Sequence, residues 1–300
     1  MPTNNNGPGD VKPVLLAKQY PLATETKARA INKQYLRLMQ TAVKESMPEI
    51  MAAVRAERNE SSTIRTDGIS DLAEIVRRAF RKVKERFARY VVDFGAEEQY
   101  RDAGASTNEW SKRQWRNTIR QTLGVDIRDD YFSGEIYDQL VHEWAAENVQ
   151  KITSISDQAL DQMQEVITKD FMQGKAPTSI ASDIQGRYSV SRSKATMLAR
   201  DQVGTLNAEI TKTQQTTCGV RKYQWSSSGD ERVRACHAEL DGRIISWDDP
   251  PEMWYETKSG IVYTGRHCHP GEDYECRCVA LPVFDDEDDL NDDAFVSGRG

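Results

Sequence analysis

Cysteine and histidine are gathered into one short stretch of this chain, and that clustering constrains the fold more than any other feature. Four of the five cysteines and three of the four histidines lie between Cys236 and Cys278. Thiolate and imidazole are the ligands that zinc prefers, and a structural zinc site needs four of them. The residues before Cys236 hold no such cluster and show helical patterns. The sequence therefore predicts a mainly α protein with a small α+β C-terminal domain, that is, an elongated helical body and a compact, zinc-stapled β-rich module.

The composition narrows the class of protein. Charged residues make up 29% of the chain, which is typical of well-solvated helices that also pack against copies of themselves. No apolar run approaches the ~20 residues that a membrane span needs, and the N-terminus lacks the pattern of a signal peptide. An odd number of cysteines without a secretion signal favours reduced thiols in a cytosolic compartment. We expect no membrane association and no disulfide framework.

Changes in composition divide the chain into four parts. Residues 1–22 read as an extended N-terminal arm, 23–217 as the helical body, 218–284 as the small β-rich Cys/His domain and 285–300 as an acidic disordered tail. The tail carries seven carboxylates and no base between Asp285 and Asp293, so the net charge of −7 resides in it. Three roles suit such an acidic run: it keeps the chain soluble, it contacts a basic surface of a partner, or it repels DNA.

Apolar residues at three- and four-residue steps predict the helices of the body. The predicted helices run from Thr24 to about residue 57, from Ser70 to Phe94, from Trp110 to Leu123, from Ser133 to Met172, from Thr178 to Gln185 and from Ser191 to Thr216. We expect a loop between Gly95 and Gly104, and Ser191 as an N-cap. His142 falls within a predicted helix and reads as a structural or surface histidine.

The second predicted helix has one apolar stripe and one basic face. Val76, Phe80, Val83 and Phe87 share an arc of about 100°. The candidates for contact with DNA or an acidic partner lie on the other side and are Arg77, Arg78, Arg81, Lys82 and Arg89. Lysine and arginine supply most non-specific affinity for nucleic acid, although a solvated face that meets acidic neighbours has the same composition.

Short strand patterns replace the helical ones after Cys218. The strand candidates are Val220–Trp225, Arg243–Trp247, Gly260–Thr264 and Cys276–Val283. Little aliphatic side chain is available to this region, so we expect Trp225 and Trp247 to fill a thin core. Small domains of this kind usually need a cross-link, such as a bound metal ion, to be stable, and zinc would supply it.

The predicted ligands of a structural zinc ion are His237, Cys276 and Cys278, with His269 as the fourth. Cys276 and Cys278 are two residues apart, so both thiols leave the same face of a strand. His269 precedes a proline and a glycine, a turn that would aim its ring at them. Cys268 is a substitute for His269, and Cys236, adjacent to His237, stays open as an alternative ligand. Four protein ligands would leave no position for water, which indicates structure and not catalysis.

Residues from about Asn148 to Phe284 resemble the phage head-morphogenesis family typified by phage Mu protein F and the SPP1 minor head protein. The segments that carry the resemblance are Gln173-Gly174, Ala199-Arg200-Asp201 with Asn207, Tyr223-Gln224-Trp225, His237 with Leu240-Asp241-Gly242, His269-Pro270 and Cys276-Arg277-Cys278. Their ordered combination is specific although each piece alone is weak.

The resemblance implies a non-enzymatic minor head (capsid) protein that acts in head assembly near the portal vertex and influences DNA packaging or ejection. Expected partners are the portal protein, the major capsid protein or a scaffolding protein, with packaged DNA as a further contact. The chain would be present in multiple copies or self-associated in the virion, inside the capsid or at the portal vertex, and in the host cytoplasm during assembly.

An enzyme is the competing interpretation. His237-Ala238-Glu239, followed later by a proline and two cysteines, is similar to the zinc deaminase pattern H-x-E…P-C-x-x-C. The spacing Cys276-x-Cys278 departs from that pattern, and the residues after it read as strand rather than helix. The sequence contains no P-loop, G-x-S-x-G or G-x-G-x-x-G motif.

Overall fold

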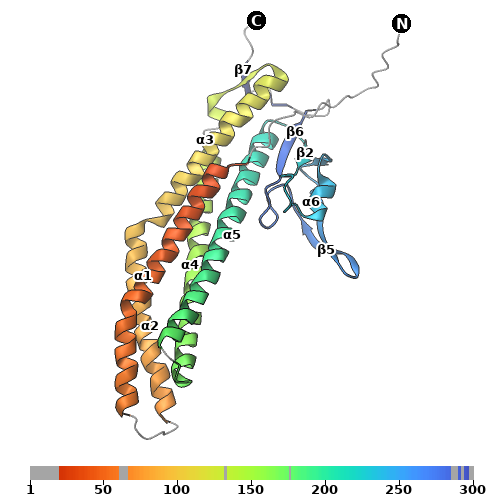
Figure 1. Ribbon diagram of the computed structural model, residues 1–300. Coiled ribbons are helices and arrows are strands. Elements are labelled where there is room, and N and C mark those ends of the chain that lie inside the picture. The colour runs from red at the N-terminus through yellow and green to blue at the C-terminus, as the bar shows by residue number, and fades with distance from the viewer. Residues whose placement is uncertain are drawn as a thin grey trace, which may run out of the picture. The chain divides into compact units, whose positions relative to one another are not determined.

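The structure is a computed structural model that describes residues 20–60, 67–131, 134–175, 177–284, 290–291 and 294–296. These residues are mainly helical, with short antiparallel strands in the C-terminal region, which confirms the predicted fold class (Figure 1). Residues 1–19 of the predicted arm and most of the predicted acidic tail lie outside the described residues. None of the described helices has the length and apolar character needed to cross a membrane.

Five long helices carry most of the chain. They are α1 (Leu22–Glu60), α2 (Asp67–Phe94), α3 (Ala96–Leu123), α4 (Glu135–Met172) and α5 (Pro177–Thr217). The apolar stripe of α2 is buried at Val76, Phe80, Val83 and Phe87, as its periodicity predicts.

Two predicted interruptions are absent from these helices. The segment between Gly95 and Gly104 is helical, because Gly95 alone adopts a positive φ and α3 begins at the next residue. Gly104 lies inside α3 where α4 approaches, and a Cβ there would stand 2.9 Å from Val141 Cγ1. Ser191 is not an N-cap, since α5 is continuous and its Oγ donates to the Arg187 carbonyl. Gly104 misled the prediction in the first region, because glycine only weakens a helix. Ser191 misled it in the second, because a serine inside a helix can bond to the carbonyl four residues back.

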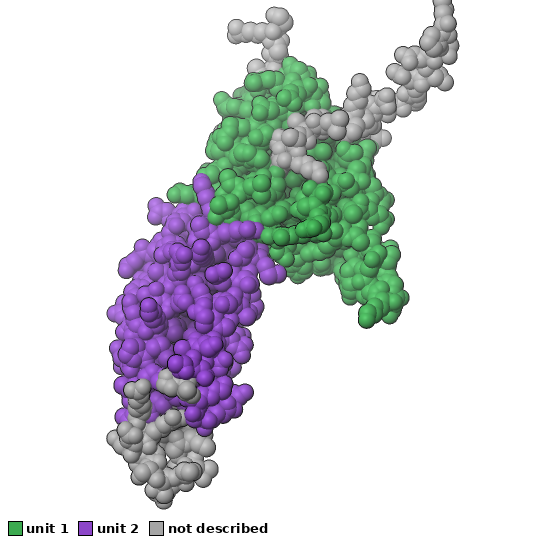
Figure 2. Space-filling model, in the orientation of Figure 1, with its two compact units in different colours: residues 1–26, 101–144, 200–300 green, residues 27–100, 145–199 purple. Residues whose placement is uncertain are grey.

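The chain forms two compact units. One consists of Lys27–Tyr100 and Ala145–Ala199, and the other of Met1–Thr26, Arg101–Trp144 and Arg200–Gly300 (Figure 2). Every long helix except α2 contributes a segment to both units. The predicted boundary between a helical body and a C-terminal domain lies elsewhere, at the change from helix to strand after α5. That division stays a prediction.

Unit 2 of Figure 2, residues 27–100 and 145–199, is a packed set of helical segments. Asn32 of α1 lies at its centre, where Nδ2 donates to the Ala195 carbonyl at 2.8 Å and Oδ1 accepts from Tyr100. The buried Tyr35 places its ring edge-on to Phe87 at 5.5 Å and shares a hydrogen bond with Thr153. Buried polar groups that are satisfied in this way fix the register of helices that apolar packing alone would let slide.

Unit 1 of Figure 2, residues 1–26, 101–144 and 200–300, holds all the described strands, in three small antiparallel sheets. The strands are β1 (Asp126–Ile127), β2 (Lys222–Ser226), β3 (Ile244–Ser246), β4 (Glu252–Thr257), β5 (Gly260–His267), β6 (Val279–Val283) and β7 (Phe295–Val296), and the sheet orders are β1-β7, β3-β2-β6 and β4-β5. A 3₁₀ turn, η1 (Asp129–Tyr131), and a short helix, α6 (Ala235–Leu240), complete the unit. The four predicted strands correspond to β2, β3, β5 and β6, whereas β1, β4, β7 and α6 were not predicted.

The pairing of β7 with β1 lies within the region predicted to be a disordered tail. Phe295 pairs with Ile127, and Ala294 before it is fully buried beside Trp115 and Cys218. Residues 294–296 are thus part of the packed unit, a difference from the expected tail. Ala294 and Phe295 follow the acidic run and supply apolar side chains to this contact.

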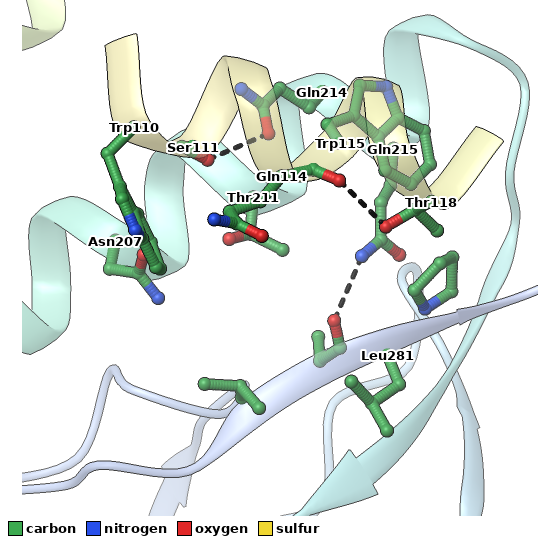
Figure 3. Close-up of a pocket in the computed structure, with 13 residues that line it drawn as sticks. Trp110, Ser111, Gln114, Trp115, Thr118, Asn207, Thr211, Gln214, Gln215 and Leu281 are labelled. Atoms are coloured by element: carbon green, nitrogen blue, oxygen red, sulfur yellow. Dashed lines mark hydrogen bonds between the residues drawn. The ribbon is translucent and has the colours of Figure 1, made fainter. Parts of the chain in front are cut away.

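The outer edge of β6 is covered by α5. Gln215 of α5, labelled in Figure 3, donates from Nε2 to the Ala280 carbonyl at 3.0 Å. Its Oε1 accepts from Trp247 Nε1 at 3.1 Å. Pro282, which has no backbone N–H, stands on the same strand, where an edge position tolerates it. The remaining space between α3, α5 and β6 is a pocket of about 50 Å³. It is lined by hydroxyl, amide and tryptophan side chains of the two helices and by apolar residues of β6, without a charged group. It has room for a water molecule or two.

Two glycines of α5 provide a matched test of this packing. Gly204 faces backbone, because a Cβ there would lie 2.8 Å from the Cys276 carbonyl oxygen and 3.2 Å from that of Gly271, whereas a Cβ at Gly186 would meet nothing. We expect Gly204→Ala to lower the free energy of unfolding by about 1–3 kcal/mol. Gly186→Ala should raise it by up to about 1 kcal/mol, since alanine is the better helix former. Urea unfolding measures both, and equal effects of the two substitutions would contradict the close approach of α5 to the Cys276 turn.

Candidate metal centre

Three predicted ligands converge at one point of unit 1. His237 lies on α6, and Cys276 and Cys278 lie between the turn at residues 271–275 and the start of β6. The ligand atoms of these residues all lie within 4.8 Å of one another, and His237 Nδ1 is 3.6 Å from each Sγ. All three residues are buried.

These distances suit a tetrahedral ion. Zinc binds sulfur at about 2.3 Å and nitrogen at about 2.0–2.1 Å, so tetrahedral angles separate the two donor atoms by roughly 3.6 Å. The His237 nitrogen therefore already stands where a shared ion would hold it. A group of two thiols and one imidazole favours zinc over magnesium or calcium, because the latter two ions prefer oxygen ligands.

The charges at the site favour a thiolate. Hydrogen bonds from Cys278 and His237 hold the pKa of the Cys276 thiol well below its usual range, against the effect of burial. The hydrogen bond to Cys276, together with burial, raises the pKa of the Cys278 thiol. Burial lowers the pKa of His237, but hydrogen bonds with Asp273 and Cys276 outweigh it and raise the pKa to about 9. One negative charge is thus shared by two sulfur atoms, and a thiolate is the form that binds metal.

Asp273 orients the histidine from the side opposite the sulfur atoms. Its Oδ2 lies 3.2 Å from His237 Nε2, while Arg234 and Arg266 approach the same carboxylate at 2.7 Å and 2.9 Å. Burial raises the pKa of Asp273, but the hydrogen bond from His237 and the two arginines outweigh it and lower the pKa to about 2. A carboxylate behind a ligating imidazole is the usual support of a zinc site. The sequence prediction missed Asp273, and its only signal was its place between His269 and Cys276.

The turn that carries Cys276 is held by α5. Glu275 adopts φ of 49°, a left-handed conformation that non-glycine residues rarely take. Its backbone N–H donates to Asp201 Oδ1 at 3.1 Å, and its carboxylate accepts from Arg200 at 2.8 Å. Strained backbone of this kind persists where the surroundings over-determine it, as at ligand sites.

The predicted fourth ligand does not join the group. His269 is buried between Tyr223 and Trp247, and its Nδ1 lies 3.0 Å from the Tyr223 hydroxyl. The predicted substitutes, Cys236 and Cys268, are buried in the surrounding core, and burial raises the pKa of both thiols. Within the described part of the chain, the metal-binding group therefore consists of one histidine and two cysteines.

One cavity of about 230 Å³ adjoins all three ligands. Its wall also contains Arg200, Arg232, Arg234 and Arg277, together with Asp230 and Glu275. Arg277 stands between the two cysteines and contacts both carboxylate oxygens of the buried Glu25, at 3.0 Å and 3.3 Å. This arginine-lined cavity was not predicted from the sequence.

The remaining sequence candidates lie elsewhere. The basic face of α2 is exposed at Arg77, Arg78, Arg81, Lys82 and Arg89, and two of these, Arg77 and Arg81, contact Glu74. Glu239, the proton carrier of the alternative enzyme, has a side chain that is 60% exposed and lies 3.8 Å from Arg243. His142 is exposed on α4.

Metal content of the purified chain tests the ligand set. We expect about one zinc per chain in the natural sequence and loss of the ion in the Cys276→Ser/Cys278→Ser variant, because both sulfur donors are removed. Cys236→Ser and His269→Gln are matched controls that should retain zinc. Loss of zinc in His269→Gln, with the fold intact by circular dichroism, would restore His269 as a ligand.

Comparison with known proteins places these residues in a family context. Residues 161–281 match the family described as Phage Mu protein F like protein, a segment that contains all three converging ligands. An uncharacterized protein of Haemophilus influenzae is 28% identical over 279 residues, which cover 93% of this chain and 56% of that protein. Minor head protein GP7 of Bacillus phage SPP1 is 29% identical over 125 residues, 40% of each chain.

The chain thus spans about half the length of the curated relatives it matches. No solved structure matches it significantly. The matches confirm the resemblance predicted from the sequence: through residues 161–281, this chain is related to the phage Mu protein F-like and minor head proteins.

Proposed function

We propose that this chain is a minor head protein that takes part in bacteriophage head assembly near the portal vertex. The observation that carries the proposal is the family match over residues 161–281, supported by the similarity to the minor head protein of phage SPP1. Its partners are then the portal protein, the major capsid protein or a scaffolding protein, and its place is the virion after assembly in the host cytoplasm. From a position near the portal vertex, the chain would influence DNA packaging or ejection.

The metal has a structural role in this proposal. Four of the ten buried residues around the site are cysteines, and aliphatic side chains are few among them. A zinc ion held by His237, Cys276 and Cys278 would join α6 to the turn before β6 and stabilise a thin core. The exposed position of Glu239 speaks against the deaminase alternative, since that chemistry needs the glutamate beside the metal.

Contact with DNA is assigned to the basic face of α2. Its five candidate side chains are exposed along one side of a helix whose opposite side is buried. Among the described residues, Arg78 and Lys82 have no recorded carboxylate partner and remain available to phosphates. An acidic surface of another head component would be bound by the same face.

Particles of a phage that encodes this chain test the assembly role. We expect the chain to co-sediment with high-salt-washed heads in far fewer copies than the major capsid protein, as quantified by mass spectrometry. Cys276→Ser/Cys278→Ser should reduce incorporation, because the module that carries the family segment loses its metal staple.

Two control variants sharpen that experiment. Cys218→Ser removes a buried thiol outside the metal group, and Glu239→Ala removes the carboxylate of the alternative enzyme. Both should be incorporated normally. Absence of the chain from washed particles would refute the proposed function, and loss of infectivity with Glu239→Ala in correctly assembled heads would favour the enzyme.

Salt-dependent binding to duplex DNA tests the basic face. Arg78→Gln/Lys82→Gln should reduce the slope of log K against log salt by about two, because each lost phosphate contact removes about 0.9. Lys194→Gln/Lys258→Gln, which removes the same charge from exposed positions elsewhere, is the matched control. Equal slopes for the two double variants in fluorescence anisotropy would exclude α2 as the DNA-binding face.

A further inference from the structure

The metal group offers three protein ligands, and a tetrahedral ion takes four. His269, Cys236 and Cys268 do not approach the group, and no other histidine, cysteine or carboxylate of the described residues belongs to it. His237, Cys276 and Cys278 all contribute to the wall of the same 230 Å³ cavity. The fourth coordination position therefore opens into that cavity.

Arg232 is the one arginine of the cavity that lacks a carboxylate partner among the described residues. Two thiolates cancel the charge of a divalent ion and the imidazole ligand is neutral, so the centre itself carries no net charge. The wall contains four arginines, Arg200, Arg232, Arg234 and Arg277, and Glu275, Asp273 and Glu25 neutralise three of them. Three of the arginines already hold carboxylates at 2.7–3.0 Å. Within the described chain, Arg232 has no recorded ion-pair partner.

This combination selects an oxyanion. Guanidinium groups bind phosphate and carboxylate oxygens in a fixed fork geometry, and a negatively charged oxygen is also a good zinc ligand. The cavity has room for several water molecules and hence for a group of the size of phosphate. A neutral ligand would gain nothing from the unpaired arginine.

We propose that the fourth ligand of the metal is a phosphate-type oxyanion, held in the arginine-lined cavity by Arg232. This inference rests on the proposed structural metal and names the ligand that completes its coordination. The oxyanion is a free phosphate or the terminal phosphate of a nucleic acid, since both present the same oxygen atoms.

Cobalt substitution of the full chain tests the proposal, because the visible bands of protein-bound Co²⁺ report a change of its fourth ligand. After removal of excess cobalt, inorganic phosphate should shift these bands in a saturable manner. Arg232→Gln should weaken the apparent affinity for phosphate by about tenfold or more, the effect of one charge-assisted hydrogen bond. Arg243→Gln, an arginine paired with Glu239 outside the cavity, should leave the affinity unchanged.

A short oligonucleotide with a 5′-phosphate, compared with the same oligonucleotide without it, distinguishes the two sources. A shift with the phosphorylated form supports a nucleic-acid end as the ligand, and a shift with inorganic phosphate alone supports the free ion. Two results would overturn this inference without affecting the metal site. In one, cobalt binds tightly but neither probe changes its spectrum; in the other, phosphate shifts the spectrum equally in the natural chain and in Arg232→Gln. Failure to bind any cobalt or zinc refutes the metal site itself and this inference with it.

Discussion

The convergence of one imidazole and two sulfur atoms is the contact on which the C-terminal part of this chain depends. Its sheets have only two or three strands each, and sheets this small seldom bury enough apolar surface to stand alone. The core around them is built from aromatic rings and cysteines, with Leu240 and Met253 as the longer aliphatic members. A metal held by His237, Cys276 and Cys278 would add a strong, directional link between α6 and β6, two elements that share no backbone ladder.

Ion pairs connect the segment before β6, which carries the two cysteines, to the helices of the same unit. Arg277 projects from between the two cysteines to the buried Glu25 in the first turn of α1, and Arg200 of α5 approaches that carboxylate and Glu275. Removing one member of such a buried network leaves an uncompensated charge, which costs far more than the pair contributes. The position of Glu275 and its left-handed backbone follow from its contacts with α5. Arg200 binds its carboxylate and Asp201 accepts from its backbone N–H. The metal ligands are thereby placed by helix contacts as much as by the sheet.

Much of this architecture could be predicted from the sequence, and the failures have physical causes. Apolar periodicity located α1, α2 and α4, the C-terminal half of α3 and both ends of α5, and residue chemistry selected His237, Cys276 and Cys278. The predicted break before Ser191 was wrong because a serine or glycine inside a well-packed helix only lowers its stability. Asp273 and the cavity arginines escaped prediction because carboxylates and arginines are common in this chain, and only the fold shows which of them face the sulfur atoms. His269 has the chemistry of a ligand but bonds to Tyr223 instead.

An incompletely ligated metal gives the module a property that a closed site lacks. Any ligand that binds only the folded, metal-loaded state adds to its stability in proportion to the logarithm of ligand concentration over the dissociation constant. The oxyanion would therefore stabilise the turn before β6 only after the metal is bound, because the metal provides one of its contacts and the arginines provide the others. Metal-free protein would retain the arginine cavity but lose the direct bond to the oxyanion. Binding of metal and binding of oxyanion are thus coupled, and each raises the affinity for the other by the same factor.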